Sequence, residues 1–304
     1  MAITCRCNVG LSNTGTECTP LMAVQKKIIL VPYFDGDGNI NEVDLTSTFN
    51  QAFFDALVNQ ADRTKRWFPL PEMKNIADER GEDIFEEFED TSRAFIQQGA
   101  RTFTGLLIGH TPQLLGKIKS ARCVEVGIFV VDRDGNLIGS QLRDGFLAPV
   151  RLDKESVSAR LMKTTDTTVQ KLTLSFNFHV NENDEDLRMI ASTEMLVSVA
   201  SLRGLLDISP EYSSISTTDF TVELRTDYGT PINPVLDEGL LTANFSLFNV
   251  TTALAVVITS VVESPDGVYD INFAAQASTN VLRLTPSKAG RDYTNVIESL
   301  ITIP

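Results

Sequence analysis

The sequence predicts a mainly β protein with a few helices, an α+β fold of two domains. The first observation is length, because 304 residues exceed the usual size of a single domain. The second is an alternation of apolar and polar residues, whose period of two is typical of half-buried strands. The third is the region after Phe220, where short strands, among them one at Leu254–Val262, follow one another between Gly, Pro, Asn and Asp turns.

We expect three segments along the chain. Residues 1–23 form an extended N-terminal arm that contains cysteines, residues 24–209 an antiparallel sheet-and-helix domain with long hairpins, and residues 210–304 an immunoglobulin-like β-sandwich. The second boundary is placed at Pro210, which closes a stretch rich in Leu and Ile.

The cysteines are unevenly distributed. Cys5, Cys7 and Cys18 crowd the N-terminal arm, and their spacing differs from the CxxC pairs of zinc sites, so we expect no metal there. Free thiols and a disulfide within the arm both fit the pattern. Cys123 precedes an apolar strand, and we expect it to be a small buried hydrophobe.

The first strand of the second segment is expected at Val24–Pro32, and the turn DGDGN follows at residues 35–39. This turn matches the first half of a calcium loop. Because Ile40 stands where such a loop needs Gly, and Thr46 where it needs Glu, we expect no calcium site.

Two helices are expected in this domain. The first has Asp44 or Thr46 as N-cap, and its buried face is formed by the apolar residues Phe49, Phe53, Ala56 and Leu57. The second covers Thr111–Ile118, with Thr111 as N-cap and Pro112 as its first residue. His110 precedes it, and we interpret this histidine as a local hydrogen-bonding group.

The segment Trp67–Pro71 must be extended, because each proline disfavours the helical conformation of the residue before it. Two interpretations stay open for this segment, contact with a partner or a loop that covers the core. The first makes Trp67, Phe68, Pro69 and Pro71 candidate interface residues.

Six carboxylates lie between Glu82 and Asp90, among several apolar residues. Glu86, Glu87 and Asp90 could supply a carboxylate pair for glycoside hydrolysis. We prefer a solvated edge, because neither an aromatic sugar platform nor a His/Asp cluster stands nearby in the sequence.

Two hairpins are expected, one joining Val124–Val131 to Leu137–Leu142 and one joining Val157–Met162 to Val169–Val180. The alternation in 169–180 predicts one buried and one wet face over a strand about 40 Å long. The polar row of this strand contributes the remaining candidate subunit-interface residues, Thr173, Ser175, Asn177 and His179. A plain solvent face is the alternative interpretation.

The charge balance disfavours several functions. Lys and Arg number 26 against 40 Asp and Glu, and the net charge of −14 repels nucleic-acid phosphate and anionic membranes. Two histidines and the lack of a GxSxG frame leave little material for His-based metal sites or a serine hydrolase. We therefore expect no enzyme, no cofactor, no small-molecule substrate and no membrane partner.

Several phrases resemble virion structural proteins of phages that infect Bacteroidota, including the crAss-like group. They are CNVGLSNTG, KKIILVPYFDGDGNIN, RWFPLPEMKNI and DIFEEFEDTSRAFIQQGARTFTGLLIG, and the resemblance spans about residues 5–205. It implies a non-enzymatic protein of the phage particle, whose identical subunits form a ring of the tail, in a tube, ring or collar. It also implies assembly in the host cytoplasm and contact with other tail or collar proteins. The net charge adds the expectation that DNA passes such a ring without specific binding.

Two other classes of function remain open. One is a capsid decoration or surface adhesion protein that uses its immunoglobulin-like domain. The other is a glycan hydrolase that uses the carboxylates of 82–90.

Overall fold

A computed structural model of the chain describes residues 22–89, 91–110 and 112–304, so Cys5, Cys7 and Cys18 lie outside the described residues. Strands hold 45% of the described residues and helices 12%, which confirms the mainly β class with few helices. The chain divides into two compact units, Met1–Gly204 (unit 1) and Leu205–Pro304 (unit 2). The division comes before the expected residue 210, because Pro210 lies inside a strand of unit 2.

The first sheet of unit 1 is built on an antiparallel pair, β1 (Gln25–Pro32) and β8 (Val126–Asp132). The remaining strands are β14 (Leu187–Ile190) and β9 (Leu137–Ser140) beyond β8, β3 (Phe68–Pro69) beyond β1, and β11 (Val150–Arg151), which also pairs with β8. Strand β8 is buried along its whole length, as its unbroken apolar run requires. The first expected hairpin is confirmed, because β8 pairs with β9.

The second sheet of unit 1 has one buried and one outward face. Its strands, in spatial order, are β12 (Ser158–Met162), β13 (Lys171–Asn177), β7 (Arg101–Ile108) and β4 (Lys74–Arg80). The expected alternation of β13 is confirmed, since its apolar residues are buried and Thr173 and Ser175 are not. The strand is shorter than expected and ends at Asn177, because Phe178 leaves it to form a bridge with Leu152.

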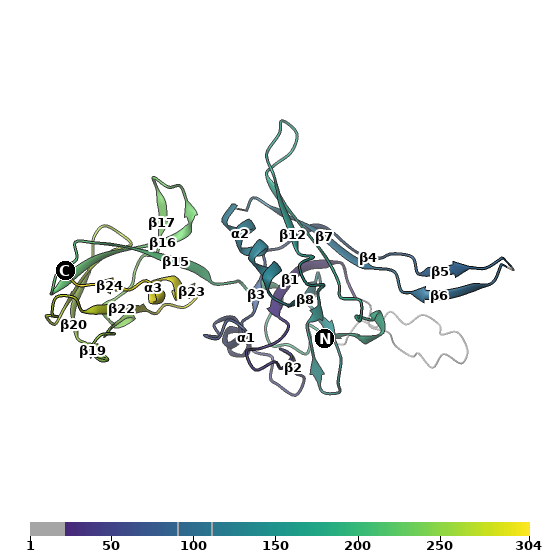
Figure 1. Cartoon of the computed structure of the whole chain (residues 1–304), viewed down its shortest axis with the longest axis horizontal. Coiled ribbons are helices and arrows are strands. Elements are labelled where there is room, and N and C mark those ends of the chain that lie inside the picture. Colours follow the sequence, from purple (N-terminus) through teal and green to yellow (C-terminus); the bar gives the residue numbers. More distant parts are fainter. Residues whose placement is uncertain (1–21, 90, 111) are drawn as a thin grey trace. The chain divides into compact units, whose positions relative to one another are not determined.

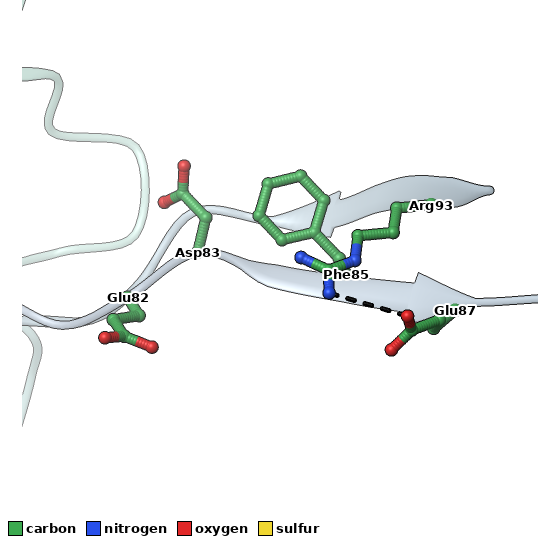
Figure 2. A pocket seen from close by; sticks show the side chains of 5 residues that line it. All are labelled: Glu82, Asp83, Phe85, Glu87 and Arg93. Carbon is green, nitrogen blue, oxygen red and sulfur yellow. Dashed lines mark hydrogen bonds and ion pairs between the residues drawn. The ribbon is translucent and has the colours of Figure 1, made fainter. Parts of the chain in front are cut away.

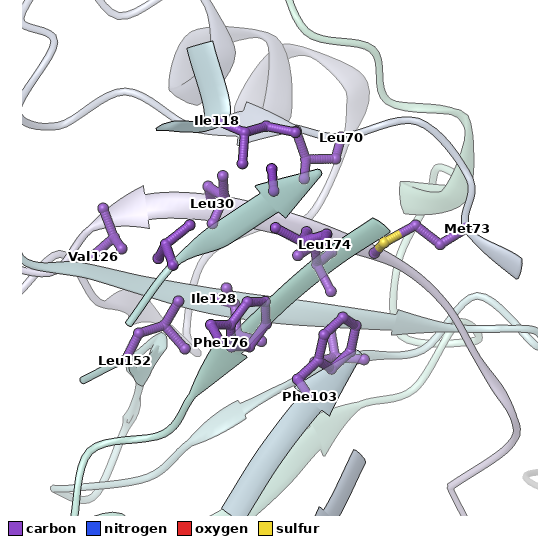
Figure 3. Close-up of a cluster of buried hydrophobic side chains, with 14 of the residues drawn as sticks. Leu30, Leu70, Met73, Phe103, Ile118, Val126, Ile128, Leu152, Leu174 and Phe176 are labelled. Atoms are coloured by element: carbon purple, nitrogen blue, oxygen red, sulfur yellow. The ribbon is translucent and has the colours of Figure 1, made fainter. Parts of the chain in front are cut away.

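The two sheets enclose the main hydrophobic core (Figure 3). Ile128 of the first sheet and Leu174 of the second both belong to it. The rings of Phe103 and Phe176 stack with centroids 4.5 Å apart. Helix α2 (Pro112–Ser120) adds Ile118 and begins at the expected proline, while Thr111 lies outside the described residues.

Helix α1 (Gln51–Val58) belongs to a second layer around Trp67. Its N-cap is Asn50, whose side chain accepts the Phe53 N–H at 2.9 Å, rather than the expected Asp44 or Thr46. Within the helix the buried residues are Phe54 and Val58, rather than the expected Phe53, Ala56 and Leu57, whereas Phe49 is buried as expected but precedes the helix. Two short strands that are far apart in the sequence, β2 (Val43–Asp44) and β10 (Phe146–Leu147), pair with each other.

Unit 2 is a β-sandwich, because one apolar core draws residues from both of its sheets. The larger sheet contains β20 (Ile258–Glu263), β21 (Val268–Phe273), β16 (Asp219–Gly229), β15 (Leu206–Ser213), β23 (Arg291–Asp292) and β17 (Pro234–Leu236). The smaller sheet contains β19 (Leu254–Val256), β18 (Phe245–Asn249), β22 (Val281–Pro286) and β24 (Ile301–Thr302). The expected single strand at 254–262 is two strands, one in each sheet.

Unit 2 also contains a five-residue helix, α3 (Thr294–Glu298), which was not expected from the sequence. Its buried residue Val296 is part of the apolar core of the unit. Among the residues that the structure describes, no helix has the length and apolar character needed to cross a membrane.

Lys27 is a buried charge in the interior of unit 1. It lies on β1, is only 4% exposed, and its ammonium group donates to the carbonyl oxygens of Ala200 and Leu202. These carbonyls belong to the end of a short 3₁₀ turn, where a cation is favourable. Burial nevertheless lowers the pKa of Lys27 to about 8, against an opposing effect of Glu72.

Lys27 makes the stability of unit 1 depend on pH. The folded state releases the Lys27 proton near pH 8, whereas the unfolded chain holds it to about 10.5, so the unfolded state binds more protons between these values. The free energy of unfolding should therefore rise by about 2 kcal/mol between about pH 7.5 and 9.5. Urea titrations followed by the fluorescence of Trp67, the single tryptophan, measure it. Lys27→Met should lack this rise, and equal slopes for both proteins would contradict the assignment.

Candidate functional site

The most exposed feature of unit 1 is a hairpin that extends beyond its second sheet. Strands β4 and β7 continue into β5 (Ile84–Glu87) and β6 (Arg93–Gln97), which pair with each other alone (Figure 1). We call residues 81–99 the arm, and this name does not refer to the N-terminal arm of residues 1–23. Every described residue from Gly81 to Gln98 is exposed, so no other described part of the chain covers it.

The arm presents large apolar side chains to solvent. Ile84, Phe85, Phe88, Phe95 and Ile96 are between 46% and 59% exposed. Phe85 lies directly opposite Phe95 in the strand pair, and their rings meet edge to face with centroids 5.8 Å apart. Such a concentration of exposed apolar residues marks an interaction site more often than a free surface.

The arm is also strongly acidic. Figure 2 shows Glu82, Asp83 and Glu87 around a hollow that Phe85 and Arg93 also line. The Arg93 guanidinium lies 3.5 Å from the Glu87 carboxylate, and both side chains are mostly exposed. By sequence, the arm carries six acidic residues and one basic residue.

The carboxylates of the arm do not converge as a hydrolytic pair would. Glu86 and Glu87 are successive residues of β5, so their side chains point to opposite faces of the hairpin. Asp90 lies outside the described residues. The preferred interpretation of this segment, an exposed edge, agrees with its burial pattern, but its pairing as a hairpin was not foreseen.

Ion pairs anchor the base of the arm. Arg101 holds Asp78 through two bonds of 2.6 and 2.7 Å, with both side chains largely buried. Arg80 binds both carboxylate oxygens of Asp184, at 2.8 and 3.1 Å, and Arg101 also contacts Asp184. The hydrogen bond from Arg80 lowers the pKa of Asp184, so this pair persists below the usual titration range of an aspartate.

Gly99 lets the two strands cross closely at this base. A Cβ atom at this position would lie 2.0 Å from the Gly81 carbonyl oxygen, so only glycine fits. The Gly81 N–H donates to the Ala100 carbonyl oxygen at 2.9 Å, and the Gly99 N–H to the Asp83 carboxylate at 3.0 Å. The direction in which the arm leaves the sheet is therefore set by backbone packing as well as by charge.

The aromatic and proline candidates lie mainly inside unit 1. Trp67 is 2% exposed and is stacked on Phe129 with ring centroids 4.7 Å apart, so its side chain is unavailable to a partner. Pro69 is buried, Pro71 is half-buried and Phe68 is 38% exposed. The extended conformation expected for this segment is present, because Phe68 and Pro69 pair with β1. The burial of Trp67 and Pro69 favours the second interpretation of this segment, a loop that covers the core.

The polar candidates lie on or beside the outward face of the second sheet. Thr173, Ser175 and Asn177 follow one another on the outward side of β13. His179 lies beyond the end of this strand, where its N–H donates to the Arg151 carbonyl and its Nδ1 accepts the Asn181 N–H. The structure thus brings three of the four together on one face.

Other sequence features have local structural roles. Asp35 accepts the N–H groups of Asp37 and Asn39, and the Lys65 ammonium lies 3.4 Å from its carboxylate. Within the described residues, no group of three or more His, Cys, Asp or Glu is arranged to hold a metal ion.

The structure also shows the surroundings of His110 and Cys123, the two remaining residues that the sequence analysis discussed. The His110 carbonyl accepts a bond from Gln170, and burial lowers the pKa of its imidazole. Cys123 is exposed, which corrects the expected burial, because it ends the 3₁₀ turn Ala121–Cys123 before the apolar strand begins.

Comparison of the sequence with protein-family models and with curated proteins finds no match.

The anchor at the base of the arm should stabilise unit 1. Arg101→Met leaves the largely buried Asp78 carboxylate without its ion-pair partner, and we expect a loss of about 2–3 kcal/mol in the free energy of unfolding. Arg93→Met is the matched control, because it removes an exposed pair of the same type and should cost less than about 0.5 kcal/mol. Denaturant titration followed by Trp67 fluorescence measures both. Equal losses of unfolding free energy in the two variants would contradict a greater stabilising effect of the Arg101–Asp78 pair.

Proposed function

We propose that this protein is a non-enzymatic structural component of a phage particle, which self-assembles into rings of the tail, in a tube, ring or collar, and lines or surrounds the conduit for DNA ejection. The observation that carries the proposal is the arm, an exposed hairpin with five large apolar side chains. The resemblance of residues 5–205 to virion proteins of Bacteroidota phages supplies the class of particle.

The physical argument for assembly starts from the instability of an isolated hairpin. Two strands without a third strand or a covering layer are marginally stable in water. Burying a phenylalanine side chain contributes about 1.5–3 kcal/mol, so covering Phe85 and Phe95 would both fix the hairpin and hold a neighbour. Ring closure also removes exposed sheet edges, of which unit 1 has several.

The charge of the chain supports the second part of the proposal. A net charge of −14 gives the DNA backbone few sites at which to bind, so DNA would slide through an acidic conduit. Other tail or collar proteins are the expected neighbours of the ring.

A second candidate function, capsid decoration or surface adhesion through unit 2, is favoured by one observation. The β16–β17 hairpin of the sandwich exposes Tyr228, Ile232 and Val235, with Ile232 at 88%. These residues would contact a component other than the ring. The stoichiometry in the particle separates the two functions, because a tail ring contains few copies whereas a decoration follows the capsid lattice.

Assembly should depend on the apolar residues of the arm. We expect the wild-type protein to form rings or stacked tubes, measured by light scattering and negative-stain imaging over a range of concentrations with the thiols reduced. Phe85→Ser with Phe95→Ser should raise the concentration needed for assembly by roughly 100-fold, because two apolar contacts are lost. The unfolding midpoint of unit 1 should not change, because both rings are exposed.

The matched control is Tyr228→Ser with Val235→Ser, which removes two exposed apolar side chains from unit 2. Unchanged assembly of the control would locate the dependence in the arm. A wild-type protein that stays monomeric at every concentration would contradict the ring proposal, and loss of assembly in the control alone would favour the second candidate.

A further inference from the structure

The outward face of the second sheet carries a mixed apolar and basic surface at one end. The strand register places Met162 of β12 opposite Lys171 of β13, and Lys171 opposite Ile108 of β7. Arg160 lies next along the outward side of β12 and is exposed. Met162 and Ile108 are each 48% exposed. We call Ile108, Arg160, Met162 and Lys171 the basic patch.

The hairpin that carries most of the basic patch has a basic balance. By sequence, residues 157–171 contain three basic residues and one acidic residue, Arg160, Lys163, Lys171 and Asp166. The arm has the reverse balance, six acidic and one basic. Each surface also presents exposed apolar side chains, so the two are complementary in both respects.

The same sheet separates the arm from the basic patch. The arm leaves the sheet beyond the Arg80–Arg101 pair, at one end of β7, and Ile108 lies at the other end of that strand. Seven residue steps along a strand measure about 24 Å. Figure 1 shows the arm continuing away from the sheet beyond β4 and β7. The anchored arm of a molecule therefore points away from its own patch, and the complementary surface must belong to another molecule.

We propose that the arm of one copy docks on the basic patch of the next copy. This inference rests on the proposed ring function and names the two surfaces that would contact each other between neighbouring copies. The carboxylates of the arm face Arg160 and Lys171, while Phe85 and Phe95 cover Ile108 and Met162, whose sulfur is a favourable neighbour for aromatic rings. The contact is heterologous, since each copy uses its arm to contact one neighbour and its basic patch to contact another. Such contacts build closed rings or open helical tubes.

Charge reversal tests this pairing. The arm variant is Glu86→Lys with Glu89→Lys, and the patch variant is Arg160→Glu with Lys171→Glu. Each alone places like charges opposite each other, and we expect each to need a roughly 100-fold higher concentration to assemble. The matched control, Asp134→Lys with Asp144→Lys, changes the charge by the same amount as the arm variant at exposed positions outside both surfaces and should assemble as wild type.

Rescue makes the test specific. The arm variant mixed with the patch variant should assemble as alternating copies, and one chain that carries all four changes should assemble alone, because both restore opposite charges. Circular dichroism and Trp67 fluorescence verify that every variant is folded.

Two results would overturn the inference in distinguishable ways. If wild type forms rings and both variants form them equally well, or if neither combination restores assembly, arm and patch do not pair although the ring function stands. If wild type never assembles, the inference fails together with the proposed function.

Discussion

The ion pairs of Arg80 and Arg101 with Asp184 and Asp78 fix the point at which two strands leave the hydrophobic core of unit 1. On the core side of this point, β4 and β7 belong to a four-stranded sheet with one buried face. Beyond it, the chain has no layer to pack against, and its apolar side chains stay in water. The ion pairs fix the direction in which the hairpin leaves the sheet, and the proposed assembly contact depends on that direction.

Local patterns were sufficient for much of the fold. The alternation of Leu172, Leu174 and Phe176 predicted a half-buried strand, and the apolar run 124–131 before a turn predicted the first strand of a hairpin, because both signals are contained in a few consecutive residues. Tertiary contacts decided the rest. Helix α1 buries Phe54 because Trp67 lies next to it, and no local signal reveals that contact. The strand expected at 254–262 changes sheets at Val257, which periodicity alone does not show.

The candidate site was only partly predictable for the same reason. The exposure of residues 82–89 follows from their charge, but the hairpin depends on the pairing of Phe85 with Phe95 across the turn. The paired apolar residues on both sides of that turn were the signal that could have revealed it. No sequence motif marks the basic patch, because Ile108, Met162 and Lys171 are brought together only by the strand register. Of the candidate interface residues, Thr173 lies next to this patch on β13, whereas Trp67 is buried inside unit 1.

The most direct test of the account is zero-length carbodiimide cross-linking of assembled wild-type protein made from equal amounts of ¹⁴N- and ¹⁵N-labelled chains. Mass spectrometry then distinguishes links between copies from links within one copy. The account predicts mixed-isotope links from the carboxylates of residues 82–89 to Lys171 and Lys163. Assembled protein in which the arm carboxylates link only within their own chain, or to lysines remote from the basic patch, would contradict it.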